Sequence, residues 1–379
     1  MNRIIELKKN AEMFYTEIAL SDVADVYTGK QLNKSDMSND GLYAVMNGGI
    51  EPSGYTNNYN EEENTITISQ GGASAGYVNW NSEKIWIGAH CYAIHPIKNK
   101  INNRYLYFVL KEKQEVLMQS KQGAGIPGLN RSIIQKLYIP LPHTNVQKRI
   151  VEILDSFTNL IDALNEELSL RQKQFEYYRE KLLTFDDNTN RYCLKEVFET
   201  KNGYTPSTSN KEYWDNGNIP WFRMEDIRQN GRILNDSTLH ITRAGVKGNR
   251  LFKANSIILA TSATIGEHAL ILVEHLSNQR FTNFYPNEAF DKKINMKYIY
   301  YYMFIIDEWC KSHVNQGGFA SVDMDGLFKL SIPIPSLAIQ QSIVEKLDAF
   351  EFLISSLKEE IALRQKQYEY YREKLLTFN

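Results

Sequence analysis

The sequence predicts an α+β protein in which two mixed α/β domains are separated by two long helices, packed as an antiparallel coiled coil with a pseudo-twofold internal repeat. The first observation is a repeated segment. RQKQFEYYREKLLTF at Arg171–Phe185 returns as RQKQYEYYREKLLTF at Arg364–Phe378, with fourteen of fifteen positions identical and an offset of 193 residues. The second is an unbroken apolar spacing through both copies, and the third is a similar order of turns and strands in residues 14–138 and 186–331. Together they predict two consecutive copies of one plan.

The boundaries of the expected parts follow from proline-containing segments. Ile139–Pro142 and Ile332–Pro335 lie directly upstream of the repeated helices, which suits helix starts near residues 144–147 and 337–340. Four parts are expected: an N-terminal segment with the first mixed domain (the first head, 1–143), a central long helix (the first spacer helix, 144–185), the second mixed domain (the second head, 186–336) and a C-terminal long helix (the second spacer helix, 337–379).

Each spacer helix carries a narrow apolar seam. Apolar residues recur at intervals of three and four, interrupted midway by Arg171 or Arg364, and neither run contains Gly or Pro. This spacing is typical of coiled coils, so we expect the two seams to pack against each other. The predicted interface residues are Leu154, Phe157, Ile161, Leu164, Leu168, Phe175, Tyr178 and Leu182 in the first helix, and Leu347, Phe350, Ile354, Leu357, Ile361, Tyr368, Tyr371 and Leu375 in the second.

The charges along the helices favour an antiparallel arrangement. Residues 147–167 hold five acidic and two basic residues, whereas 168–185 hold four basic and two acidic residues, and the second copy has the same division. Antiparallel pairing sets acidic halves against basic halves, while parallel pairing sets like charges together. The alternative is that these charges are simply solvated, because exposed ion pairs contribute only fractions of a kcal/mol.

The composition of the 379 residues excludes several classes of protein. With 42% hydrophobic residues, 23 Tyr and 17 Phe, the chain is not disordered. The N-terminus lacks an apolar signal core, and no run reaches eighteen uncharged apolar residues. The three cysteines, Cys91, Cys193 and Cys310, are isolated, which predicts a reducing, cytoplasmic setting without a zinc site. The net charge of −2 means that any nucleic-acid site must be locally basic.

The two heads share a scaffold with different loops. In the first head we expect strands at 65–68, 77–80, 85–87 and 92–94, followed by an amphipathic helix over 105–121. In the second head, Ser256–Leu270 resembles Thr65–Val78, with Gly266 matching Gly76, and a helix from Tyr298 resembles that from Tyr105. The spacer helices are nearly identical and the heads are not, which is typical of a constant spacer that carries two domains with different recognition surfaces.

Basic and amide side chains are candidates for DNA contact. Residues 223–253 hold seven basic and three acidic residues interleaved with Asn, Gln and aromatic residues. Arg, Gln and Asn can pair bidentately with guanine and adenine edges. The alternative is a solvated, turn-rich surface. The candidates are Arg223, Arg228, Gln229, Arg232, Arg243, Lys247 and Arg250 in the second head and Lys30, Gln31, Lys34, Asn47, Gln70 and Asn79 in the first.

No motif predicts catalysis or a cofactor site. Gly123–Gly128 matches GxGxxG, but a helix precedes it and Pro127 lies within it, unlike the strand–turn–helix of a dinucleotide site. No P-loop motif occurs, and no N/D/S-P-P-aromatic tetrapeptide, as expected of an amino-methyltransferase, is present. The histidines His90, His95, His268 and His275 are isolated, and isolated histidines are usually structural. We therefore predict no catalytic residue, no metal ligand set and no cofactor in this chain.

At this point the layout resembles the specificity subunit of type I restriction–modification systems. The resemblance covers essentially the whole chain and includes the order of heads and helices, the IPLP and IPIP segments, and the Q-x-x-I-V-E-x-L-D helix starts at Gln147 and Gln340. IPWFRMEDI at Ile219–Ile227 and NSIILATSATIG at Asn255–Gly266 resemble segments of the family's target-recognition domains, and YAVMNGG at Tyr43–Gly49 resembles a second subclass.

The resemblance implies a non-catalytic DNA reader. Each head would read one half of a bipartite, asymmetric target, and the helix pair would set the unread gap. A helix of about 38 residues is roughly 57 Å long, which corresponds to on the order of one to one and a half turns of DNA. The implied partners are double-stranded DNA, two modification subunits that use S-adenosylmethionine to methylate adenine, and ATP-dependent restriction subunits. S-adenosylmethionine, ATP and Mg would be bound by these partner subunits. No membrane partner is implied.

Two other functions remain as alternatives. One is a self-contained DNA-modifying enzyme, which the missing cofactor and catalytic motifs disfavour. The other is a coiled-coil scaffold that binds only proteins, which two elaborate aromatic-rich heads disfavour. An isolated-chain assay with S-adenosylmethionine distinguishes the reader from the enzyme, and specific duplex binding distinguishes the reader from the scaffold.

Overall fold

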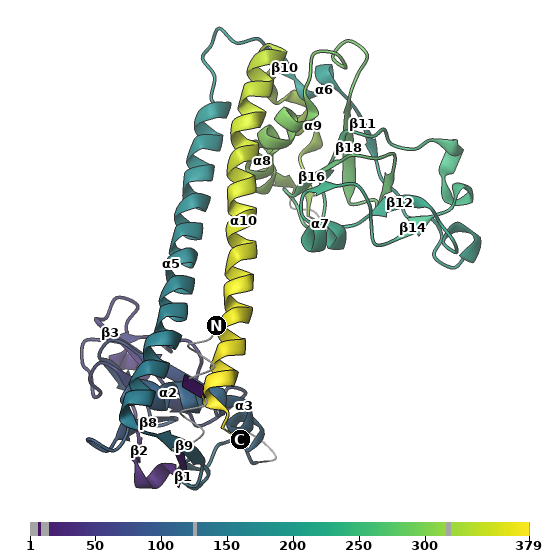
Figure 1. The fold of residues 1–379 in the computed structure, drawn as a ribbon. Coiled ribbons are helices and arrows are strands. Elements are labelled where there is room, and N and C mark those ends of the chain that lie inside the picture. Colours follow the sequence, from purple (N-terminus) through teal and green to yellow (C-terminus); the bar gives the residue numbers. More distant parts are fainter. Residues whose placement is uncertain (1–6, 9–14, 124–126, 316–319, 379) are drawn as a thin grey trace. The chain divides into compact units, whose positions relative to one another are not determined.

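A computed structural model describes residues 7–8, 15–123, 127–315 and 320–378 (Figure 1). Residues 124–126, inside the GxGxxG match, lie outside this description. The chain divides into two compact units: unit 1 comprises Met1–Glu167 with Leu357–Asn379, and unit 2 comprises Leu168–Ser356. Each unit therefore contains one head and parts of both long helices, α5 (Thr144–Leu183) and α10 (Leu337–Leu376).

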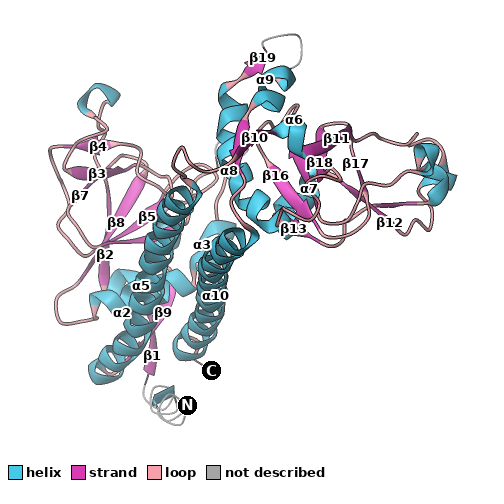
Figure 2. Ribbon diagram, turned by 90° about the horizontal axis from the view of Figure 1, so that it is seen from above, coloured by secondary structure: helices cyan, strands magenta, loops and turns pink. Residues whose placement is uncertain are grey.

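Unit 1 contains a mixed α/β head (Figure 2). Its main sheet has the strand order β2-β8-β5-β6, beside a three-stranded sheet β4-β3-β7 and a pair β1-β9. The elements are β1 (Tyr15–Ala19), η1 (Leu20–Asp22), β2 (Ala24–Thr28), η2 (Lys34–Asp36), β3 (Tyr43–Met46), β4 (Tyr55–Thr56), β5 (Thr65–Ser69), β6 (Val78–Asn81), β7 (Ile85–Ile87), β8 (Cys91–Pro96), α2 (Asn103–Glu112), α3 (Gln114–Gln119), α4 (Arg131–Gln135) and β9 (Tyr138–Pro142).

The predicted strands of the first head are confirmed to within two residues, whereas the predicted single helix over 105–121 is wrong in detail. The helix starts earlier, where Asn102 caps α2 by accepting a hydrogen bond from Tyr105 N at 2.9 Å. It is interrupted at Lys113, between α2 and α3. Around this break, Gln114 Oε1 accepts from Val78 N and Lys111 Nζ donates to Val78 O, so both side chains bind the edge strand β6.

Unit 2 repeats the design. Its main sheet has the order β11-β18-β15-β16-β13, beside β14-β12-β17 and the pairs β10-β21 and β19-β20. The elements are β10 (Arg191–Cys193), α6 (Leu194–Val197), β11 (Phe198–Asn202), η3 (Lys211–Tyr213), β12 (Ile219–Phe222), α7 (Met224–Asn230), β13 (Ile233–Leu234), β14 (His240–Ile241), η4 (Arg243–Gly245), η5 (Lys247–Asn249), β15 (Ser256–Ala260), β16 (His268–Ile271), β17 (Leu276–Ser277), β18 (Phe281–Pro286), α8 (Met296–Ser312), β19 (Val314–Asn315), β20 (Ser321–Val322), α9 (Met324–Lys329) and β21 (Ser331–Pro333).

The same side chains join head to spacer helix in both units. In unit 1, buried Gln147 accepts a hydrogen bond from Asn102 N at 2.9 Å and donates to Pro142 O at 2.8 Å. In unit 2, buried Gln340 accepts from Asn295 N at 2.8 Å and donates to Pro335 O at 2.8 Å and to Lys293 O at 2.9 Å. Each glutamine thus satisfies backbone groups at a helix start and in the preceding loop, which would otherwise be buried without partners.

Gly76 and Gly266 confirm the correspondence of the two scaffolds. Both have positive φ, +93° and +75°, and in each a Cβ would meet the backbone of the head helix, at 2.6 Å from Met118 N and 2.5 Å from Asp307 O. Only glycine accommodates both the left-handed conformation and the close approach. The turn before β6 and the turn before β16 are therefore equivalent structural elements of the two repeats.

Each unit contains a short section of the helix pair. In unit 1, the ring of Phe157 on α5 stacks on Tyr371 of α10, with centroids 5.4 Å apart. In unit 2, Tyr178 on α5 stacks on Phe350 of α10 at 5.3 Å. Because Phe157 precedes Tyr178 whereas Tyr371 follows Phe350, the helices run antiparallel, as predicted. All sixteen predicted seam residues are buried or half-buried. Within the described part of the chain, no helix is both long and apolar enough to cross a membrane.

Candidate nucleic-acid interface

Three predicted residues of the first head lie around one turn, Asn47–Ile50. Asn47 Oδ1 accepts a hydrogen bond from His90 N at 3.2 Å, and Asn79 Nδ2 donates to Ile50 O at 3.3 Å. Gln70 N donates to His90 O at 2.9 Å. We call residues 29–31, 47–50, 70–76, 79 and 88–91 the first loop cluster. It brings together the amide side chains of Asn47 and Gln70, which lie in two separate loops, and of Asn79 on β6.

Lysine side chains extend the first loop cluster. Gly29 N donates to Cys91 O and Lys30 N to Ile87 O, both at 3.0 Å, so Lys30 follows the same backbone, with its side chain exposed. Exposed Gln31 comes next, and exposed Lys34 lies in the adjacent 3-10 turn η2. His90, an isolated histidine for which the sequence favours a structural role, is an exposed member of the cluster. The signal that identifies it is its position in the loop that precedes β8.

In the second head, the short helix α7 supports the predicted residues Arg223, Arg228 and Gln229. Arg228 and Gln229 are exposed in the last turn, whereas Arg223 is half-buried, 3.8 Å from the Glu225 carboxylate. The helix is fixed by Asp226, which is fully buried and accepts hydrogen bonds from Arg223 N, Thr238 N and Thr238 Oγ1, all at 2.7 Å. A satisfied buried carboxylate of this kind holds a helix in one orientation.

The guanidinium of Arg232 is paired with a buried carboxylate inside the second head. Arg232 Nη1 lies 3.1 Å from Asp307 Oδ2, and the same oxygen lies 2.7 Å from His268 Nδ1. The Asp307 side chain is 3% exposed and the Arg232 side chain 30%. Arg232 therefore compensates a buried charge within the protein.

Arg243, Lys247 and Arg250 form a separate group on the turns η4 and η5 and the residue that follows them. Tyr204 holds this region, because its hydroxyl donates to Gly245 O at 3.1 Å and accepts from Lys247 N at 2.6 Å. The Lys247 ammonium lies 4.9 Å from the Tyr204 ring centre. All three basic side chains are exposed. The seven predicted residues of the second head thus divide among α7, the buried pair of Arg232 and the η4–η5 turn.

The loop before β18 supplies two residues that the sequence does not single out, exposed Gln279 and Arg280. Thr261 N donates to Arg280 O at 2.9 Å, as Gln70 N donates to His90 O at 2.9 Å in the first head. Thr205 Oγ1 donates to Gln279 Oε1. We call residues 203–205, 261–266 and 278–280 the second loop cluster. It shares this backbone hydrogen bond with the first loop cluster, but it presents Arg280 where the first presents His90, and Gln279 beside it.

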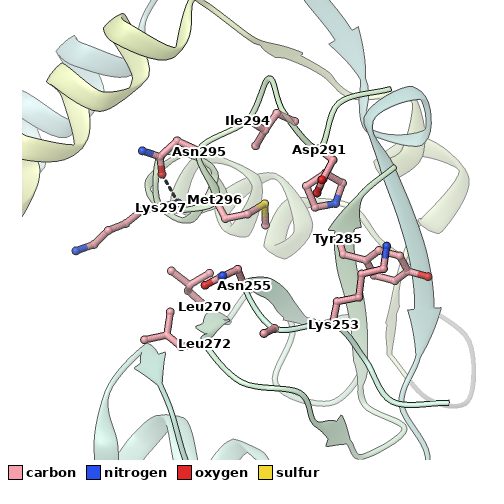
Figure 3. A pocket seen from close by; sticks show the side chains of 12 residues that line it. Lys253, Asn255, Leu270, Leu272, Tyr285, Asp291, Ile294, Asn295, Met296 and Lys297 are labelled. Carbon is pink, nitrogen blue, oxygen red and sulfur yellow. Dashed lines mark hydrogen bonds between the residues drawn. The ribbon is translucent and has the colours of Figure 1, made fainter. Parts of the chain in front are cut away.

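Each head also has a cavity at the start of its head helix, α2 in unit 1 and α8 in unit 2. The cavity of unit 2, about 490 Å³, has lining residues that include Lys253, Tyr285, Asn295 and Lys297 (Figure 3). Burial and the neighbouring Glu199 raise the pKa of Tyr285 to about 12. The corresponding cavity of unit 1, about 480 Å³, has lining residues that include Asn102 and Arg104.

In both units a basic side chain that lines the cavity forms an ion pair with the spacer helix. Arg104 Nε lies 2.7 Å from Asp155, and Lys297 Nζ lies 2.8 Å from Asp348. The cavities therefore mark the junction of head and helix.

Buried titratable groups elsewhere are structural. Burial lowers the pKa of His275 to about 4, so its ring is neutral, and His275 Nδ1 lies 2.9 Å from Val273 O. Burial raises the pKa of Cys91 and of Cys310 to about 12, which keeps both thiols protonated. Among the residues that the structure describes, no group of three His, Cys, Asp or Glu side chains could hold a metal ion.

Comparison with known proteins identifies the fold and family. The family described as "Type I restriction modification DNA specificity domain" matches residues 15–170 and 187–363. The EcoprrI specificity subunit of a type I restriction enzyme from Escherichia coli is 51% identical over 196 residues, which cover 49% of each chain, so the match spans about half the length of that relative. A putative type I restriction enzyme specificity subunit of Haemophilus influenzae is 30% identical over 352 residues, 86% of each chain.

A solved structure shows the same fold over nearly the whole chain. The crystal structure of a type I restriction–modification S subunit from M. genitalium has a TM-score of 0.62 and 19% identity, with 96% of each chain covered. The double match of the family, once per repeat, agrees with the duplicated head and helix described above. The chain belongs to the family of type I restriction–modification DNA specificity domains.

Proposed function

We propose that the chain is the DNA-reading, non-catalytic subunit of a type I restriction–modification complex, and that each head reads one half of a bipartite, asymmetric target. The observation that carries the proposal is the pair of loop clusters, which share backbone hydrogen bonds but present different side chains. A common scaffold with different polar readers suits two unlike half-sites, because base edges are discriminated by side-chain donors and acceptors.

The proposed contact residues are exposed or half-exposed polar side chains of the two heads. We retain the boundaries 1–143 and 186–336 for the reading domains. Arg232 is excluded because it is paired with buried Asp307. The set comprises Lys30, Gln31, Lys34, Asn47, Gln70, Asn79 and His90 in the first head, and Arg223, Arg228, Gln229, Arg243, Lys247, Arg250, Gln279 and Arg280 in the second.

The spacer helices set the gap between half-sites and hold the partner subunits. Outside the seam, Leu170 and Tyr177 of α5 are 58% and 57% exposed, and their repeats Leu363 and Tyr370 of α10 are 66% and 52% exposed. A duplicated apolar row suits two copies of one partner, the adenine-methylating modification subunit. S-adenosylmethionine, ATP and Mg act on the modification and restriction subunits, and the complex works in the cytoplasm.

Modified-base sequencing tests the function. DNA is sequenced from cells that carry the modification subunit, with and without this chain. A two-part adenine-methylated motif is expected only when the chain is present, because the modification subunit alone lacks the readers. Absence of a new motif, despite a stable complex with the modification subunit, would support the scaffold function instead.

Changing α7 is expected to relax only one half of the motif. Arg228→Met with Gln229→Ala removes two exposed polar side chains of the second head, and should weaken binding to the cognate duplex by roughly 10- to 100-fold. The change is measured by titration with duplexes mutated in either half-site. Lys195→Met, which removes an exposed charge on α6, is the matched control. An equal loss for both half-sites would contradict the assignment of α7 to one half.

A further inference from the structure

Two buried acidic side chains fix helix α7: Asp226 at its first turn and Asp307, through Arg232, just after its last turn. At its first turn, Asp226 accepts three hydrogen bonds from Arg223 and Thr238. At its last turn, Gly231 N donates to Ile227 O at 3.0 Å, and Gly231 takes a positive φ of +86°, which turns the chain out of the helix. The next residue is Arg232, which follows Arg228 by four positions.

Arg232 is held by several groups at once. Its guanidinium lies 3.1 Å from Asp307 Oδ2 and 3.4 Å from His268 Nδ1, and 5.0 Å from the Phe304 ring centre. Asp307 and Phe304 belong to α8 and His268 to β16, so the cation joins α7 to two different elements of the scaffold. Its own carbonyl also accepts from Leu270 N at 2.8 Å.

The charge at this point is needed inside the protein. His268 is fully buried and the Asp307 residue is 2% exposed, and an isolated carboxylate there would carry a large desolvation cost. Among the residues that the structure describes, Asp307 Oδ1 has no hydrogen-bond partner, and Oδ2 carries the interactions with both Arg232 and His268. Withdrawal of Arg232 toward a phosphate or base would leave Asp307 without its guanidinium partner.

We propose that Arg232 and Asp307 are positioning residues of the second head: they fix the C-terminal end of α7 so that Arg228 and Gln229 present one geometry to the second half-site, and Arg232 itself does not contact DNA. This inference rests on the proposed reading function of the second head. It assigns the specificity of α7 partly to a buried carboxylate that DNA cannot reach.

The first head has a neutral group at the same place. Position 114 corresponds to Asp307 at the repeat offset of 193, and there Gln114 accepts hydrogen bonds from Val78 N at 3.0 Å and Lys111 Nζ at 2.8 Å. Lys111 in turn corresponds to Phe304. We call the ion pair of Arg232 and Asp307 the charged clamp. It is specific to the second head, and its removal should affect only one half of the target.

A double-mutant cycle tests the proposal with Arg232→Met, Asp307→Asn and the double variant. We expect both single variants to lower discrimination at the second half-site by about tenfold, leave the first half-site unchanged, and show a double variant no worse than either single one. Lys329→Met, an exposed charge on α9, is the control. A smaller salt dependence with Arg232→Met, together with unchanged reading by Asp307→Asn, would mean that Arg232 contacts DNA and would overturn the proposal.

Hydrogen exchange gives a readout that does not depend on DNA. Amides of residues 224–231 should exchange faster in both single variants than in the wild type, while those of β15 and β18 keep their protection. Unchanged exchange in α7 overturns the positioning role even if no target motif is found. If the wild-type chain directs no bipartite methylation but the variants loosen α7, the reading function fails and the clamp stands. Asp307→Asn is the safer variant for folding, because it leaves no buried charge and the Arg232 side chain, which is 30% exposed, can be solvated.

Discussion

Replacing Asp226 by alanine is expected to destabilise the second head by about 3–5 kcal/mol, because it removes a fully buried carboxylate that accepts three hydrogen bonds. Asp226 is fully buried, and both of its oxygens accept hydrogen bonds at 2.7 Å. Alanine fills neither the space nor the hydrogen-bonding role. Asp226→Asn should cost less but still a substantial amount, since its amide group presents a donor toward one of the backbone or hydroxyl donors.

The measurement for Asp226 must separate the two units, because a chain with two compact units need not unfold in one step. Urea unfolding followed by hydrogen exchange locates the loss in residues 219–241. Glu225→Ala is the matched control, since Glu225 is its exposed neighbour on α7 and should change stability by less than about 1 kcal/mol. Comparable losses for the two variants would show that Asp226 is not the anchor of the helix.

Replacing Gln147 or Gln340 by alanine is expected to cost about 2–4 kcal/mol each, and each change should act on its own unit. Gln147 is 2% exposed and Gln340 fully buried, and each joins the start of a spacer helix to the start of a head helix. Without the amide, Asn102 N or Asn295 N loses its acceptor and Pro142 O or Pro335 O its donor. Backbone groups buried without partners account for most of the cost.

Unfolding with unit-specific probes tests the glutamines. The change at Gln147 should lower protection in unit 1 and that at Gln340 in unit 2. Gln365→Ala on the exposed face of α10 serves as the control and should stay within about 0.5 kcal/mol of the wild type. Loss of protection in both units from either single change would contradict independent anchoring.

The helices were predictable from the sequence because their signal is local and repeated. The apolar spacing at Leu154, Phe157 and Ile161 recurs at Leu347, Phe350 and Ile354, and the starts near 144 and 337 agree with α5 and α10. The strands at Thr65–Ser69 and Ile85–Ile87 were predictable from short β-branched runs between turns. The break at Lys113 was not, because it accompanies side-chain bonds to a distant strand.

The candidate interface was predictable only in part, because counting charges treats each one as solvated. Arg228 fits that assumption, since it is exposed. Asp226 and Asp307 do not, because both are buried and bind donors that are remote in sequence. For the same reason Arg232 resembles a contact residue in the sequence. The sequence gives no signal for Arg280, because its place in the second loop cluster depends on the loop register shared by the two heads.

The division of the chain has a consequence for the order in which the protein is made. Unit 2 is continuous, Leu168–Ser356, whereas unit 1 needs Leu357–Asn379 as well as its N-terminal part. Leu375 and Leu376 of α10 belong to the same apolar core as Tyr105 and Leu154. During synthesis the first head leaves the ribosome early, but these two residues of its core follow the whole of unit 2. We therefore expect the core of unit 1 to be completed after that of unit 2, against the usual N-terminal-first order of domain folding.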